Sequence, residues 1–215
     1  HGIKQVDGIL ADLGVSSHQF DVAERGFSTR FDAELDMRMN QKGDISAYHV
    51  VNEYDEQDIA RVLFDYGELK NARAMANVIV TARKDKEIRN SDELKKVLAK
   101  FLPGHKSNKI LAQIYQAIRI EVNQEMDVLK EFLEQSLEIL KPGGRLSVIS
   151  YHSLEDRLVK RFVKNGMFEG EPERDFFGNF EVPFKTIEKL IVPSEEEIAI
   201  NNRARSAKLR VAEKI

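Results

Sequence analysis

Apolar residues recur every three or four positions along residues 108–140, the longest periodic stretch of the chain. This spacing places them on one face of an amphipathic helix. The stripe consists of Leu111, Ile114, Ile118, Val122, Met126, Leu129, Leu133, Leu137 and Leu140. The stretch is long for one helix, so we expect a break near Asn123. The run 141–144, Lys-Pro-Gly-Gly, should end the second helix, because proline cannot continue a helix and glycine accepts left-handed geometry.

Three shorter helical stripes occupy residues 55–101. They consist of Ile59, Val62, Leu63 and Tyr66, then Met75, Val78 and Ile79, then Leu94, Val97, Leu98 and Phe101. We expect Ser91 to cap the third helix and Pro103-Gly104 to end it. No strand pattern separates the stripes, which therefore predict a helical insertion.

Four segments have the length and apolar content of β-strands: residues 6–13, 145–151, 184–192 and 207–212. Between the second and third strands, Ser153 to Phe162 predicts a helix capped by Ser153, with Asp156 three residues on in a capping-box arrangement. We expect ordered loop with short helical turns over 16–52 and a surface loop over 166–182.

The order strand, helices, strand, helix, strand, strand predicts an α/β fold with a helical insert after the first visible strand. Four strands with so long a helical excursion are typical of one part of a larger doubly wound domain.

The composition is that of an ordinary globular chain, with 42% hydrophobic and 32% charged residues among 215. The absence of cysteine excludes disulfides, thiolate metal sites and a cysteine nucleophile, and favours a cytoplasmic location. No apolar run is long enough to cross a bilayer. The net charge of −3 neither supports nor refutes a nucleic-acid partner.

Polar residues follow the first two strands, where open parallel sheets bind ligands. Asp12 can accept hydrogen bonds from an amine or hydroxyl, and Gly14 allows close approach of a ligand to the backbone. The alternative is that Asp12 and Ser16 only cap a turn. We expect the segments around Gly14 and Tyr151 to emerge side by side from adjacent parallel strands.

In the second of these segments, capping explains Ser153 and Asp156, and the helix dipole favours Glu155 near the helix N-terminus. Tyr151 and His152 are left as candidates, although a lone histidine is more often structural than catalytic.

Two clusters of cations are candidates for phosphate contacts: Arg25, Arg30 and Arg38, and Arg203, Arg205, Lys208 and Arg210. Solvated surface charge is the alternative for both clusters.

Long runs of the sequence resemble one family, ribosomal RNA small subunit methyltransferase H. The runs are 7–17 (DGILADLGVSS), 25–28 (RGFS), 35–39 (LDMRM), 66–68 (YGE), 116–120 (QAIRI) with 122–123 (VN), 142–146 (PGGRL), 152–157 (HSLEDR) and 203–206 (RARS). The resemblance covers essentially the whole chain.

The resemblance implies a partial class I (Rossmann-like) methyltransferase sheet with an inserted helical subdomain. It implies methyl transfer from S-adenosyl-L-methionine to a cytosine N4 of 16S rRNA in the small ribosomal subunit, with no metal. The domains would be 1–20, methyltransferase core with the cofactor-side loop; 21–107, a mainly helical insertion for substrate recognition; and 108–215, the C-terminal part of the core.

The resemblance also suggests residue roles. By the resemblance, Asp12 and Gln19 would contact the cofactor. Our own hypothesis from the position at the strand end is that Asp12 and Ser16 are the catalytic residues, with Asp12 orienting the cofactor and Ser16 or a nearby backbone carbonyl contacting the amine. The residues expected to contact RNA are Arg25, Arg38, His152, Arg157, Arg203 and Arg205.

The chain departs from the family pattern at its start, because the glycine-rich cofactor loop and the acidic ribose-binding residue lie upstream of the region seen here. About the N-terminal third of the family pattern is therefore expected to be missing. The alternative function is a catalytically incompetent fragment whose helical module still binds RNA. The sequence leaves the oligomeric state open, a homodimer included.

Overall fold

A computed structural model describes residues 2–173, 176–177 and 181–215. The chain divides into two compact units. The sheet unit combines the segment up to Gly14 with Met126–Ile215, and the helical unit comprises Val15–Glu125.

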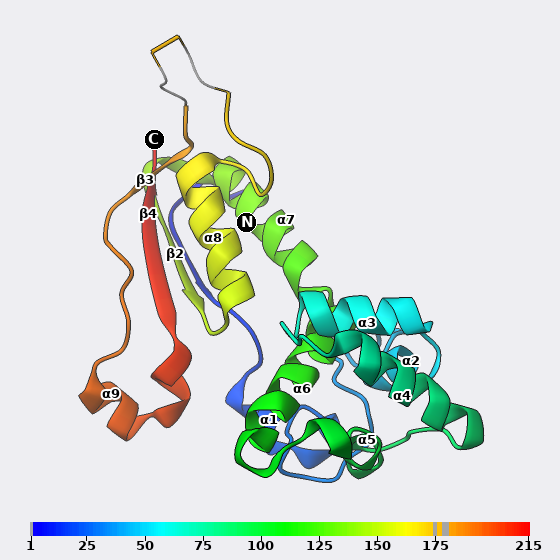
Figure 1. The fold of residues 1–215 in the computed structure, drawn as a ribbon. Helices are drawn as coiled ribbons and strands as arrows, with labels where there is room; N and C mark the ends of the chain where they lie inside the picture. The colour runs from blue at the N-terminus through cyan, green and yellow to red at the C-terminus, as the bar shows by residue number, and fades with distance from the viewer. Residues whose placement is uncertain (1, 174–175, 178–180) are drawn as a thin grey trace. The chain divides into compact units, whose positions relative to one another are not determined.

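The sheet unit is built on a four-stranded sheet of order β1-β2-β4-β3 (Figure 1). The strands are β1 (Val6–Asp12), β2 (Leu140–Ser150), β3 (Phe184–Thr186) and β4 (Lys208–Lys214). β1 and β2 are parallel, whereas β4 pairs antiparallel with both β2 and β3. The predicted α/β class, with helices inserted between the first two strands, is confirmed.

Among its described residues, the same unit holds the α-helices α7 (Glu125–Ile139, whose first residue still belongs to the helical unit), α8 (Ser153–Asn165) and α9 (Glu195–Ile200). In Figure 1, α8 lies in front of the sheet and runs along its strands, and its buried Val159 and Phe162 join Leu133 of α7 and Leu146 and Val148 of β2 in one apolar core. This packing holds the start of α8 close to the end of β2, which it follows directly in the sequence.

The helical unit contains α1 (Ser17–Asp21), α2 (Ala47–Asn52), α3 (Glu56–Asp65), α4 (Ala72–Asp85), α5 (Ser91–Val97) and α6 (Ser107–Asn123), with short 3₁₀ turns between them. The predicted stripes form its core, since Ile59, Val62, Leu63, Met75 and Ile79 are all buried. α3 and α4 pack against each other through these residues.

The long periodic stretch breaks close to the expected residue. Gln124 adopts a left-handed conformation, with φ of 50°, between α6 and α7. The expected stop at 141–144 is wrong, because α7 already ends at Ile139 and β2 starts at Leu140. The proline and the two glycines lie within β2, where the pairing with β1 shifts register between Val6 and Gly8.

The predicted strand 184–192 is realised only as the three residues of β3. Leu190, Ile191 and Val192 are 40%, 40% and 58% exposed. These side chains do not pack into the core, so little apolar burial favours a longer pairing of β3 with β4. A single bridge joins Ile191 to Leu209. Part of the predicted surface loop 166–182, residues 174–175 and 178–180, lies outside the described residues.

Candidate functional site

The ends of β1 and β2 lie side by side, as the sequence predicts. Asp12 pairs with Ile149 in the parallel register, so β1 and β2 end at the same edge of the sheet. The Tyr151 hydroxyl donates a hydrogen bond of 2.9 Å to Asp12 Oδ1. Burial, followed by this contact with Asp12, raises the pKa of Tyr151 to about 12. The phenol is therefore a fixed donor that holds an exposed carboxylate in place.

Gly14 follows β1 in a left-handed conformation, with φ of +83°. A Cβ at this position would meet only Glu155 Oε1, at 3.9 Å. The backbone beside Asp12 is therefore open to the close approach of a ligand, and the positive φ favours glycine at this position.

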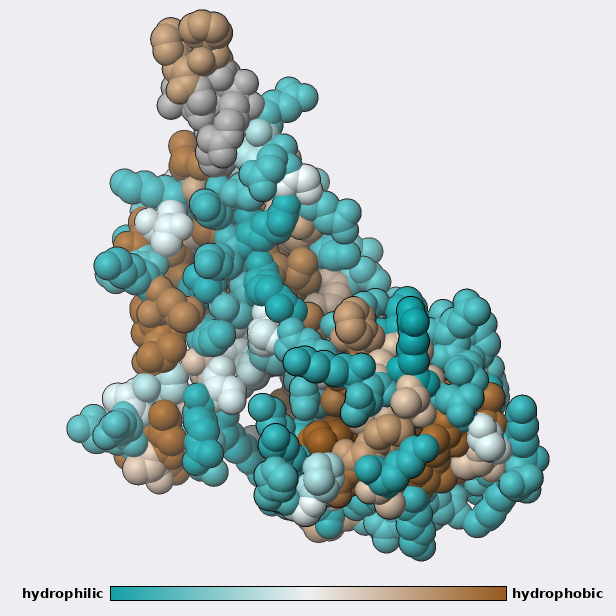
Figure 2. Space-filling model, in the orientation of Figure 1, coloured by the Kyte–Doolittle hydropathy of each residue, from teal (hydrophilic) through white to brown (hydrophobic). Residues whose placement is uncertain are grey.

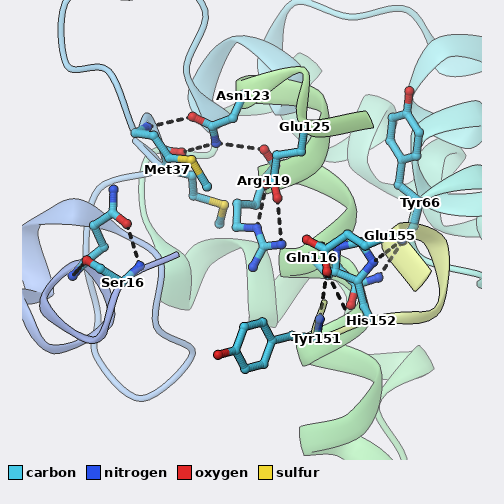
Figure 3. Close-up of polar contacts among 12 residues, drawn as sticks. Ser16, Met37, Tyr66, Gln116, Arg119, Asn123, Glu125, Tyr151, His152 and Glu155 are labelled. Carbon is cyan, nitrogen blue, oxygen red and sulfur yellow. Dashed lines mark hydrogen bonds and ion pairs between the residues drawn. The ribbon is translucent and has the colours of Figure 1, made fainter. Parts of the chain in front are cut away.

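Glu155 supports the turn that carries Tyr151, a role that the sequence did not reveal. Its side chain is 3% exposed, and Oε2 accepts the backbone N–H groups of Tyr151 at 2.8 Å and His152 at 3.3 Å (Figure 3). Burial pushes the pKa of the Glu155 carboxyl upward, but the His152 ring and the two N–H groups outweigh burial and leave the pKa below its ordinary value.

His152, not Ser153, is the N-cap of α8, so the predicted cap is wrong by one residue. His152 Nδ1 accepts the Glu155 N–H at 3.5 Å, in a capping box whose acidic member is Glu155. The ring is 10% exposed, and its Nε2 lies 3.1 Å from Glu155 Oε1 at an angle outside hydrogen-bond geometry. The histidine thus shapes the turn.

Asp156 holds α8 to the sheet and is not the capping partner that the sequence indicated. It accepts hydrogen bonds from Arg210 at 2.7 Å and Lys208 at 3.4 Å, both on β4. Burial alone would raise the pKa of Asp156, whereas Arg210 and then Lys208 bring it below its ordinary value. Two cations of the C-terminal cluster are therefore committed to this pairing.

Ser16 and Gln19 form the capping box of α1 in the helical unit (Figure 3). Ser16 Oγ accepts the Gln19 N–H at 3.3 Å, and Gln19 Oε1 accepts the Ser16 N–H at 2.8 Å. The capping alternative therefore holds for Ser16. It does not hold for Asp12, whose hydrogen bond joins it to Tyr151.

Arg25 and Arg38 tie the polar loop of the helical unit together. Arg25 Nη2 donates to the carbonyls of Arg38 at 2.6 Å and Met39 at 3.3 Å. Arg38 donates to Asp36 at 2.5 Å and to the Gly43 carbonyl at 2.8 Å. Both guanidinium groups are half-buried in these contacts, which gives each a structural role.

The remaining expected RNA contacts lie in the sheet unit. Arg157 is exposed on α8, and Arg203 and Arg205 are exposed on the 3₁₀ turn Asn202–Ser206 that precedes β4. Their exposure leaves them accessible to a polyanion.

Several of the quoted runs meet in the helical unit (Figure 3). Asn123 Nδ2 donates to the carbonyl of Met37, whose φ is +57°, and Asn123 Oδ1 accepts the Met39 N–H at 2.6 Å. Arg119 and Glu125 form a two-bond ion pair of 2.7 and 2.9 Å. The bonds of Asn123 to Met37 and Met39 span more than 80 positions and have no local sequence signal.

Comparison with known proteins identifies the family. The model of the MraW methylase family matches residues 1–215. The chain belongs to the MraW methylase family.

Curated relatives named ribosomal RNA small subunit methyltransferase H are similar to this chain throughout its length. The protein of Flavobacterium johnsoniae is 81% identical over 215 residues, which are 100% of this chain and 71% of the relative. The protein of Flavobacterium psychrophilum is 74% identical over 214 residues, 100% of this chain and 74% of the relative. The protein of Bacteroides thetaiotaomicron is 55% identical over 215 residues, which are 100% of this chain and 71% of the relative.

The family places the sheet unit among the Rossmann-like methyltransferase folds, in which the C-terminal ends of parallel strands carry the site. Asp12 and Tyr151 occupy such an edge in this member of the MraW family. Among the described residues, no helix combines the length and apolar character that crossing a membrane requires.

Proposed function

We propose that the protein transfers a methyl group from S-adenosyl-L-methionine to the N4 amino group of a cytosine in 16S rRNA of the small ribosomal subunit. The observation that carries the proposal is the Asp12–Tyr151 hydrogen bond at the shared ends of two parallel strands, in a chain of the MraW methylase family. The names of the curated relatives support ribosomal RNA as the substrate.

The residues at the end of β1 suit such a cofactor. Asp12 Oδ1 accepts a hydrogen bond from the Tyr151 hydroxyl, which leaves Oδ2 of this exposed carboxylate to accept from an amine or hydroxyl. The open backbone at Gly14 permits close approach. Bound S-adenosyl-L-methionine supplies a methyl group on a positively charged sulfur. In this proposal Asp12 orients the cofactor, and Gln19 adds a second contact.

The target amine requires an acceptor, because the lone pair of cytosine N4 is delocalised into the ring. A hydrogen bond accepted from N4–H helps this lone pair to localise as the N–C bond forms. Ser16 Oγ uses one lone pair in the α1 cap and keeps another for this purpose. The base must be unstacked to reach such a site.

The helical unit is proposed to recognise the substrate, with Arg157, Arg203 and Arg205 of the sheet unit as phosphate contacts. Their exposure supports this assignment. Arg25, Arg38 and His152 are proposed to act through the loops and the turn that they shape, because all three are engaged within the fold. We further propose that the protein works in the cytoplasm.

Calorimetric titration with S-adenosyl-L-methionine tests the role of Asp12. Asp12→Ala should abolish detectable binding, whereas Asp7→Ala, on the same strand and 86% exposed, should leave the affinity unchanged. Unchanged affinity in Asp12→Ala would overturn the role of Asp12.

Methylation of small ribosomal subunits, followed by mass spectrometry of the cytidines, tests the reaction. N4-methylcytidine that depends on Asp12 is the expected product. Absence of transfer with retained, salt-sensitive RNA binding would identify an RNA-binding module without catalysis.

A further inference from the structure

A groove that runs along α3 and the start of α4 lies entirely within the helical unit. Its volume is about 1100 Å³, comparable to the larger ligand pockets of proteins. The lining residues are Glu56, Gln57, Ala60, Arg61, Phe64, Lys70, Asn71, Ala72, Arg73 and Ala74. In Figure 2, hydrophobic patches alternate with hydrophilic side chains over the face of this unit.

Phe64 gives the groove an exposed aromatic surface. The buried face of α3 carries Ile59, Val62 and Leu63, whereas Phe64 points away from the core and is 62% exposed. Ala60, one helical turn before Phe64, and Arg61, three residues before it, line the same groove, and the small Ala60 side chain leaves one flank of the ring uncovered. An aromatic ring left open in this way can stack against a planar group.

Two cations that line the groove together with Phe64 have no partner among the described residues. Lys70 and Arg73 are exposed and form no ion pair or side-chain hydrogen bond with any residue that the structure describes. Arg61, in contrast, contacts Glu121 at 3.1 Å and Asp58 at 3.6 Å. The two free charges are therefore available to an anion from outside.

The groove has an excess of positive charge. Three cations and one carboxylate, Glu56, line it. Asn77 Nδ2 donates to Glu56 at 3.2 Å, which holds this carboxylate within the fold. An aromatic platform flanked by unpaired cations is the arrangement by which proteins bind single-stranded nucleic acid, with bases on the ring and phosphates on the cations.

We propose that this groove binds a single-stranded segment of the RNA substrate, with one base stacked on Phe64 and backbone phosphates on Lys70 and Arg73. The choice of RNA rests on the proposed function. The proposal adds a specific docking surface, which none of the family-derived contacts includes.

Binding of a fluorescein-labelled oligocytidylate, followed by anisotropy, tests the stacking. Phe64→Ala should weaken binding about 5- to 150-fold, the range found when one base–aromatic stack is removed. Phe64→Leu keeps apolar cover without a ring and should lose most of the same affinity. Full affinity in Phe64→Leu would overturn the stacking. Phe31→Leu, a change at an aromatic residue 40% exposed and outside the groove, is the matched control.

The salt dependence of the same binding tests the phosphate contacts. Lys70→Gln combined with Arg73→Gln should lower the slope of log affinity against log salt by about 1.4, at about 0.7 per phosphate on a single strand. Lys96→Gln combined with Lys109→Gln removes two exposed cations elsewhere in the helical unit and should leave the slope closer to that of the wild type. Equal slopes for the two double variants would overturn the assignment.

Two further measurements separate this inference from the proposed reaction. Cofactor affinity by calorimetry should be the same in the groove variants and the wild type. If the groove variants lose RNA affinity, but neither they nor the wild type methylate small ribosomal subunits, the proposed reaction fails and the groove remains an RNA site. If polyglutamate displaces the RNA as effectively as unlabelled oligocytidylate does, the groove is a general polyanion or acidic-peptide surface, and the proposal is overturned.

Discussion

Replacement of Glu155 should destabilise the turn that presents Tyr151. Glu155→Ala removes the acceptor of two backbone N–H groups, at 2.8 and 3.3 Å. At about 1–3 kcal/mol for each unsatisfied group, and toward the lower end because the turn is only partly buried, the loss should be about 2–4 kcal/mol. For a chain of this size that lowers Tm by about 4–16 °C.

Glu155→Gln should cost less, because the amide oxygen still accepts both N–H groups. It loses the negative charge and turns an NH2 group toward His152 Nε2, so we expect a loss of about 1–2 kcal/mol. Glu134→Gln, an exposed change on α7 in the same unit, should stay within about 0.5 kcal/mol of the wild type.

Urea denaturation followed by circular dichroism gives the free energies. Amide hydrogen exchange of the peptide at the start of α8 locates the loss, which matters because the two units need not unfold together. Equal stability of Glu155→Ala and the Glu134→Gln control, with unchanged protection of the Tyr151 and His152 amides, would refute the reasoning.

The pH dependence gives an independent check on Glu155. Its pKa is lowered in the folded protein, so its ionisation stabilises the fold fully above the ordinary value of about 4.3 and progressively less as pH falls through the folded pKa. The stability gap between wild type and Glu155→Gln should therefore narrow below about pH 4. A gap that widens with acidification would contradict this sign.

Three further outcomes are expected. Because the pKa of Tyr151 is raised to about 12, its stabilisation is complete below about pH 10 and is lost as pH rises through 12. Asp12→Asn should move this phenol titration to lower pH in the ultraviolet absorbance, with Tyr151→Phe identifying the signal among five tyrosines. Gly26→Ala should cost about 2–4 kcal/mol in denaturant melts, because its Cβ would lie 2.5 Å from a backbone carbonyl oxygen, whereas Gly170→Ala, at a similar positive φ without such a clash, should cost only about 1–2 kcal/mol. Asn123→Ala leaves the half-buried Met39 N–H and the carbonyl of the buried Met37 unpaired and should lower the unfolding free energy by about 2–4 kcal/mol; a loss below about 1 kcal/mol would contradict the role given to this amide.

Local apolar periodicity predicted the first two helices of residues 55–101 well, whereas the third, α5, is capped by Asn90 instead of Ser91 and ends at Val97, before the predicted stop at Pro103-Gly104. The stripe through Ile59 and Val62 and the stripe through Met75 and Ile79 became the buried faces of α3 and α4, because a helix that packs on one side repeats its apolar residues at the helical period. The break near Asn123 was predictable from the length of the run alone. The parallel pairing of β1 with β2 followed from the order of the elements.

Caps and polar ties were predicted less well. Ser153 carries a preferred capping side chain, yet His152 caps α8, because the buried Glu155 carboxylate receives the backbone N–H groups of the turn and contacts the ring. Arg25 and Arg38 resemble surface cations in the sequence, since the carbonyls that they bind become neighbours only after the loop has folded. Asn123 binds Met37 across 86 positions, a separation that leaves no local pattern.

The resemblance to the family therefore combines two kinds of residue. The runs containing Met37, Arg119 and Asn123 supply hydrogen bonds and an ion pair that stabilise the helical unit. Their occurrence in a sequence therefore indicates the fold of that unit. Asp12 differs from them, because it is exposed and its acceptor capacity is not exhausted by Tyr151. A substitution among the ties should reduce stability and activity together, whereas Asp12→Ala should remove cofactor affinity without a comparable loss of stability. Measuring both quantities in each variant separates the residues that build this protein from those that act in it.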